Sequence, residues 1–230
     1  MSLSRNLVGL LVLMLLLMTA GSASAQVASG DLDSSFSSSA NAAVNAIAVQ
    51  RDGKVIIGGA FTSVANQARG RVARLGTDGT VEAVGTFANP ELNGTVTGIA
   101  LLPDGKIIAI GKFTTAGGAS HNRIVRLNSN GTVDATFTVS LGSDAHAVVF
   151  TPQGKIWVGG NFGLVRIDAV SGLVDTPAGA DTFAGAVYAL AVQNDGKLVV
   201  AGKFGRVGSV ARRNIARIDG TDGRVDTTFK

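Results

Sequence analysis

The chain has 230 residues, a formal net charge of +4 and no cysteine. Its methionines, Met1, Met14 and Met18, all stand near the N-terminus. The lack of cysteine excludes disulfides, thiol catalysis and thiolate metal sites. Lysine and arginine form no run, so the small positive charge does not predict a nucleic-acid-binding surface.

The first segment has the features of a secretion signal. Arg5 precedes an apolar stretch from Leu7 to Met18, and Ala23-Ser24-Ala25 supplies the small residues of a cleavage site. A membrane-spanning helix needs roughly 20 apolar residues, and this stretch is shorter. We expect residues 1–25 to be a signal peptide cleaved after Ala25. The mature domain, 26–230, is then secreted, periplasmic or on the cell surface, with no membrane span.

The rest of the chain repeats itself four times. Each copy has an apolar stretch, a turn with glycine and a second apolar stretch that ends in Phe; the turn glycines are Gly53, Gly105, Gly154 and Gly196. An Arg followed by Leu or Ile closes a third stretch, and a fourth ends at Phe87, Phe137, Phe183 or Phe229. The repeats span roughly 44–87, 96–137, 145–183 and 187–229, and an extra copy of the last stretch stands at 32–36.

These stretches have the composition of β-strands. Ile107–Ile110 is a short apolar run rich in β-branched residues, which is typical of a strand covered on both faces. Pro103-Asp104-Gly105 is a strong hairpin signal. Four such strands make one propeller blade, which buries both faces only by stacking on its neighbours. We predict an all-β, β-propeller-type array of four four-stranded blades.

The repeat resembles that of the delta-60 repeat β-propeller family of secreted bacterial proteins. Asp52-Gly53-Lys54, Gly58-Gly59-Ala60-Phe61, Arg74-Leu75 and Leu32-Asp33-Ser34-Ser35-Phe36 carry the resemblance, which extends over nearly all of the mature chain. The third repeat departs most, because its Phe162-to-Arg166 loop lacks nine residues that the other copies have. The resemblance implies a propeller fold but no shared activity or catalytic residue.

The number of strands raises the question of ring closure. The chain holds four copies of the first three strands but five of the last, so 32–36 and 225–229 compete for one place. We therefore expect the four blades to form an open or incomplete propeller. The alternative is a closed four-bladed ring with 32–36 as a loose arm.

The repeated charged residues are interpreted as scaffold. Arg74, Arg126, Arg166 and Arg217 recur in every copy, as do Asp33, Asp134, Asp175 and Asp226. A catalytic group is needed only once, so an Arg–Asp pair that ties strands together explains the pattern better. His121 and His146 fall at different repeat positions, and no metal-ligand spacing occurs. We predict no catalytic residue, metal site or cofactor.

The loop between the second and third strands is the best candidate for a binding surface. It concentrates polar residues on what should be one rim, namely Arg69, Arg71, His121, Asn122, Arg123, Arg212, Arg213 and Asn214. Such a rim could bind an anionic or sugar ligand, although a solvated loop would have the same composition.

Two functions fit the sequence. The first is a non-catalytic extracellular module that binds an extracellular protein or a glycan or supports a cell-surface architecture, with self-association through exposed terminal blades. The alternative is a secreted propeller enzyme, a lyase or hydrolase acting on sugars or lactones. The scarcity of histidine and of acidic clusters argues against the enzyme, and the fold alone does not decide.

Overall fold

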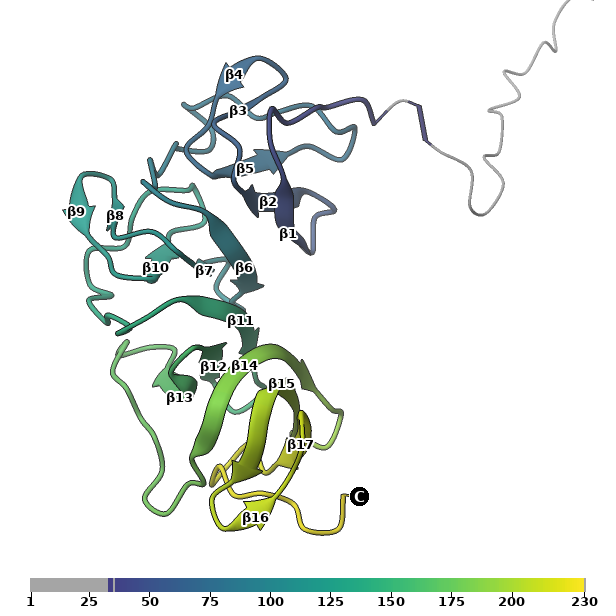
Figure 1. Ribbon diagram of the computed structural model, residues 1–230. Coiled ribbons are helices and arrows are strands. Elements are labelled where there is room, and N and C mark those ends of the chain that lie inside the picture. Colours follow the sequence, from purple (N-terminus) through teal and green to yellow (C-terminus); the bar gives the residue numbers. More distant parts are fainter. Residues whose placement is uncertain (1–32, 35, 230) are drawn as a thin grey trace, which may run out of the picture. The chain divides into compact units, whose positions relative to one another are not determined.

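The computed structural model describes residues 33–34 and 36–229. The predicted signal peptide, 1–25, lies outside the described residues. The chain divides into two units, Met1–Ser35 and Phe36–Lys230, and the fold below is that of the second unit. Every regular element in the described part is a β-strand (Figure 1).

The strands form four successive antiparallel sheets, each with its second strand in the middle. The first has β1 (Val44–Val49), β2 (Val55–Gly59) and β5 (Val72–Leu75); the second has β6 (Val96–Leu101), β7 (Ile107–Gly111) and β10 (Ile124–Leu127). The third has β11 (Ala145–Phe150), β12 (Lys155–Gly160) and β13 (Gly163–Asp168). The fourth has β14 (Phe183–Val192), β15 (Leu198–Val207) and β17 (Ile215–Ile218), with β16 (Val210–Ala211) also on β15.

The fourth stretch of each repeat is shorter than a strand. It touches the third strand through one bridge, at Leu75–Val81, Leu127–Val133, Ile167–Val174 and Ile218–Val225. Two small hairpins stand in the loops after the second strand: β3 (Ser63–Val64) with β4 (Gln67–Ala68), and β8 (Thr115–Ala116) with β9 (Ala119–Ser120). Each blade is thus a three-stranded sheet whose fourth edge is a bridge.

The predicted turn chemistry is present at the first hairpin of every repeat. Gly105 has φ +83° and its amide donates to the carbonyl of Leu102, while Asp104 accepts from the amide of Lys106. The positive φ is the reason that glycine stands there. The other three turn glycines share it: Gly53, Gly154 and Gly196.

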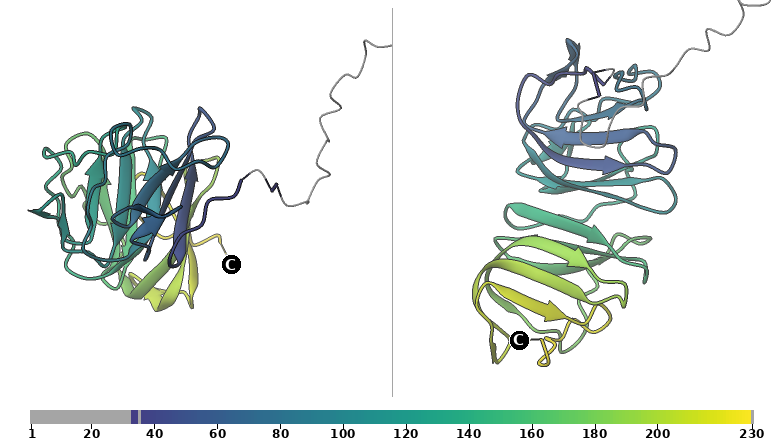
Figure 2. Two further views of the ribbon diagram at one scale, coloured as in Figure 1. Left: turned by 90° about the horizontal axis from the view of Figure 1, so that it is seen from above. Right: turned by 90° about the vertical axis from the view of Figure 1, so that its right-hand side faces the viewer.

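Adjacent blades pack through their first strands. β1 lies against β6, β6 against β11, and β11 against β14 (Figures 1 and 2). Gly58 of β2 comes so close to Val96 and Ile99 of β6 that a side chain there would clash. The largest cores lie across these junctions, which is how a blade covers the faces it cannot bury alone.

The four second-strand Phe residues are buried to different degrees. Phe61 and Phe113 are fully buried and Phe204 nearly so, whereas Phe162 is only partly buried. Phe61 packs within the first blade, with Ile57 and Leu75. Phe162 directly precedes the shortened loop, so fewer loop residues are available to bury its side chain.

Phe183 corrects the predicted third repeat. Its counterparts Phe87 and Phe137 are fully buried near the end of the fourth stretch, but Phe183 is the first residue of β14. Trp157 of β12 supplies the missing ring: it is 2% exposed, lies under Arg166 and reaches Gly223 of the next blade. The predicted repeat misplaces Phe183 because the aromatic ring at this junction comes from β12 and not from the fourth stretch.

The array is open. The first and last blades each leave one apolar sheet face exposed, marked by Ile47 of β1 and Ile215 of β17. The residues that align with them in the internal blades are partly or fully buried. The expected open propeller is therefore confirmed.

Candidate functional site

The repeated Arg residues join the blades to one another. In the second blade Arg126 donates to Asp134 at 2.8 Å, to the hydroxyl of Thr136 and, across the junction, to the carbonyl of Ala169 at 2.6 Å. Its guanidinium also lies 4.7 Å from the centre of the Phe137 ring. Arg74 and Arg166 reach the next blade in the same way. These cations are part of the scaffold, as the sequence indicated.

Each pair has a second cation, the Lys of the first turn. Lys106 lies 2.8 Å from Asp134, and Lys54 lies 2.7 Å from Glu82, which stands where the other repeats have Asp. Burial alone would raise the pKa of Asp134, but hydrogen bonds from Lys106, Thr136 and Arg126 outweigh it and hold the pKa far below its usual range. A carboxylate held ionised in this way is not a general acid.

The predicted rim residues are engaged inside their own blades. Arg69 is almost fully buried and donates to the carbonyls of Ala68 and Glu82. Arg212 occupies the same position in the fourth blade and donates to the carbonyls of Asp226 and Thr227. His121, their counterpart in the second blade, is buried, and burial lowers its pKa. The two arginines fix the loop to the blade, whereas the buried Nδ1 of His121 has no hydrogen-bond partner in the described residues.

The remaining rim residues are more accessible. Arg71, Arg123 and Asn214 share a positive φ at the start of the third strand. Arg123 donates to the carbonyl of Lys112 at 2.7 Å and lies 3.4 Å from Asp144. Asn122 is half-buried and Arg213 is exposed. Ligand binding by this rim stays a prediction. Few of its side chains are exposed enough to contact a ligand.

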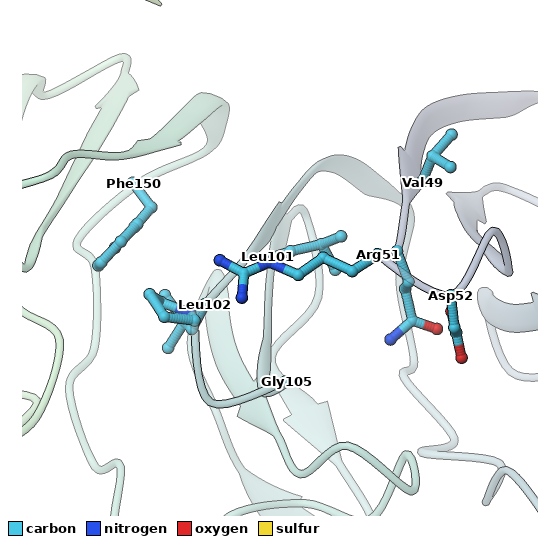
Figure 3. Close-up of a pocket in the computed structure, with 9 residues that line it drawn as sticks. Val49, Arg51, Asp52, Leu101, Leu102, Gly105 and Phe150 are labelled. Atoms are coloured by element: carbon cyan, nitrogen blue, oxygen red, sulfur yellow. The ribbon is translucent and has the colours of Figure 1, made fainter.

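A pocket of about 510 Å³ lies at the opposite end of the first strands. Val49, Leu101 and Phe150 stand at equivalent places in the first three blades and form its apolar wall with Leu102 and Pro103. Figure 3 shows these side chains around the opening, with Arg51 extended over Leu101 toward Leu102. A concave, mainly apolar site with few polar groups is the usual form of a ligand pocket.

Two polar side chains of this pocket, Arg51 and Gln50, have unused hydrogen-bonding groups. Within the described residues the Arg51 guanidinium has no ion pair or hydrogen bond, and the buried Gln50 side-chain oxygen has no donor. Arg51 is also peculiar to its repeat, because Pro103, Pro152 and Asn194 take that place elsewhere. This non-repeating cation is the sequence signal for the pocket, and a comparison of the residues that the repeats share does not reveal it.

A row of bulged residues marks the other end of the first strands. Each first strand has a register shift that leaves one residue unpaired, at Asn45, Thr97, His146 and Tyr188. Asn45 and Thr97 donate to carbonyls of the next blade. His146 instead packs edge-on against Tyr188, with ring centres 5.1 Å apart. Bulges commonly re-aim side chains, and here two of them tie blades together.

The described part of the chain has neither a metal-binding cluster nor a membrane-spanning helix. It contains no group of three or more His, Asp or Glu residues placed to hold a metal ion. It also contains no helix of the length and apolarity that crossing a membrane requires.

Sequence comparison identifies the repeats as propeller repeats. Segments 50–83, 102–137 and 193–229 match a family described as "Domain of unknown function (DUF5122) beta-propeller". They fall in the first, second and fourth repeats, so the divergent third repeat lies outside the match. The search of curated proteins found no match. A propeller repeat family is supported, while the narrower delta-60 resemblance stays a prediction.

Solved structures show similarity at the level of the fold. The structure of U3-55K aligns with a TM-score of 0.52 and 13% identity over 79% of this chain and 53% of its own. The designed protein Ika8 gives 0.51 and 14%, over 80% and 60%. The WD40 β-propeller domain of Doa1 gives 0.50 and 18%, over 77% and 50%. The chain therefore spans between half and 60% of these propellers, and such low identities carry no function.

Proposed function

We propose that this protein is a non-catalytic, extracellular β-propeller-repeat module that binds another protein through the pocket beside Arg51. The extracellular location rests on the predicted signal peptide and on the resemblance to secreted repeat proteins. The observation that carries the binding role is the pairing of an apolar pocket with a guanidinium that has no partner in the described residues.

The distribution of charge supports binding over catalysis. The repeated cations and carboxylates are engaged with one another between and within blades, as Arg126 is with Asp134 and Ala169. The pocket adds one free cation, an amide and Asp52 to an apolar wall. It has no histidine and no paired carboxylates, which the usual general acid–base mechanisms need.

The chemistry of the pocket favours a protein segment over a glycan. Val49, Leu101 and Phe150 would cover an apolar side chain, Arg51 would pair with a carboxylate beside it, and the Gln50 oxygen would accept from an amide. A sugar presents hydroxyl groups on most of its surface and would need more polar partners than this wall offers.

A peptide library displayed beside a glycan array tests this proposal. We expect selection of peptides that combine an apolar residue with Asp or Glu, and a loss of affinity of about tenfold or more in Arg51→Ala, in the range for a charged hydrogen bond. Arg213→Ala, which removes an exposed cation of the fourth blade outside the pocket, is the control. Selection of glycans alone would overturn the ligand class.

The enzyme alternative is tested on the same sample. Incubation with a panel of polysaccharides and lactones should give no turnover above the buffer control. Saturable turnover that disappears in Arg51→Ala would show that the pocket is catalytic and would overturn the proposed non-catalytic function. Turnover that survives the substitution would place a catalytic site elsewhere.

A further inference from the structure

The outer face of the first blade is half of a blade junction. Val44 of β1 is partly exposed, whereas the residues that align with it, Val96, Ala145 and Val187, are fully buried against the preceding blade. Ile47 is 66% exposed and Val49 nearly as much, again unlike their internal counterparts. The surface has the composition of a junction, and no preceding blade covers it within the described residues.

The outer face of the fourth blade is the other half. Ile215 of β17 is 49% exposed, while Val72 and Ile124 at the same position are fully buried by the following blade. Arg217 pairs with Asp226 at 2.9 Å. Within the described residues it lacks the carbonyl of a following blade that Arg74, Arg126 and Arg166 each reach.

The segment before β1 occupies part of the first half-junction. Phe36 lies against Gly79, as Phe87 lies against Gly131 and Phe137 against Gly172 in the internal junctions. Ser38 adds a hydrogen bond to the carbonyl of Gly79. Phe36 is therefore placed like the last aromatic residue of a preceding blade, although it is 40% exposed and its internal counterparts are fully buried.

We propose that the fourth-blade face of one copy of this chain docks on the first-blade face of a second copy. The contact continues an interface that the chain already builds at each of its three internal junctions. Arg217 would then donate to the carbonyl of Thr77 in the second copy, because each internal junction has an acceptor carbonyl two positions before the turn glycine, at Ser129, Val170 and Thr221.

Two copies of the four described blades suffice for a closed ring. Propellers usually have about 4–8 blades, and two copies of a four-bladed chain joined head to tail at both ends form a ring of eight. A head-to-tail contact either closes into a ring or continues as a filament. Phe229 of one copy and Phe36 of the other compete for Gly79, so Phe36 leaves when the copies join.

Light scattering after gel filtration, on the purified chain, measures the assembly. We expect twice the monomer mass for the wild type, and the monomer mass for Ile47→Lys and for Ile215→Lys alone. An equimolar mixture of the two variants should restore a dimer, because each retains the face that the other has lost. Leu173→Lys is the control: Leu173 is also 66% exposed but lies in the third blade.

The outcomes are separable from folding and from the proposed binding function. Circular dichroism of each variant shows whether it is folded. Val49 belongs to both surfaces, but Ile215 lies in the fourth blade and outside the pocket, so peptide binding by Ile215→Lys reports on the pocket independently of the docking face. Phe36→Ala should tighten self-association by removing the internal competitor. A wild type that is monomeric at all concentrations overturns the proposal, and so does a mixture that stays monomeric. A dimer lost in Ile47→Lys but kept in Ile215→Lys overturns the head-to-tail arrangement.

Discussion

At the scale of single residues, the repeated Arg of the third strand shows how its surroundings determine the contribution of a charged side chain to stability. Arg126 is almost fully buried, with partners in two blades and a ring beneath it, whereas Arg217 has the same carboxylate and ring but no following blade. A hydrogen bond made where water is excluded is electrostatically stronger than one made at the surface, so the same guanidinium contributes more at a covered junction. The place of the blade in the array therefore decides how much this Arg contributes to stability, although the residue type is the same.

Arg126→Ala tests this reasoning. The change leaves Asp134 with Lys106 as its remaining cation and removes the bond to Ala169, so we expect a loss of about 1.5–3 kcal/mol in the free energy of unfolding, the range for a hydrogen bond to a charged group. Arg217→Ala, the matched terminal variant, should lose clearly less. Urea unfolding followed by circular dichroism gives both values, and equal losses would show that the inter-blade bond contributes nothing.

The same pair makes stability depend on acidity. The pKa of Asp134 is lower in the folded protein than in the unfolded chain, so its contribution is complete above the unfolded pKa of about 3.9 and is lost as the pH falls toward the folded pKa. We expect the free energy of unfolding to fall between about pH 5 and pH 2. The gap in the free energy of unfolding between wild type and Asp134→Asn should narrow over that range, and a gap that stays constant would contradict the assignment.

At the scale of elements, the strands and first turns were predictable because their signals are local. A β-branched run next to Asp-Gly needs nothing from the rest of the chain, and the positive φ of Gly105 agrees with it. The bulges at Asn45 and His146 were not predicted, since they depend on how first strands meet. The pocket was missed for the same reason: it forms where residues of three blades converge.

Trp157 shows how one blade compensates for a missing element. It fills the place that Phe87 and Phe137 take in their junctions, and it is the only tryptophan of the chain. Trp157→Ala should lower the free energy of unfolding by about 3–5 kcal/mol, the range for a buried large aromatic side chain. Trp157→Phe keeps a ring at this place and should lose less than half of that amount. Phe162→Ala, at a partly buried site in the same blade, should cost less than Trp157→Ala. Circular dichroism must follow unfolding, because the substitution removes the fluorophore.

At the scale of the whole molecule, the described blades form a linear array in which the outer faces of the first and last blades are exposed. In such arrays stability is roughly the sum of unit and junction terms, so a blade with one junction is less stable than a blade with two. The sequence predicted this openness from the count of strands. It did not predict that Phe36 would lie on Gly79 as a preceding blade would, because that placement needs the geometry of the turn.

Hydrogen exchange should reveal the gradient in stability. β10 is buried along its whole length, whereas β17, at the same place in the last blade, has an exposed first residue and only partial cover. We therefore expect amides of β17 to exchange faster than those of β10 in dilute protein, since exchange follows local opening. Self-association would cover β17 and slow its exchange as the concentration rises, while β10 would not change. The Ile215→Lys variant should remove that concentration dependence and keep the difference between the two strands, which separates the stability of the blade from the contact between copies.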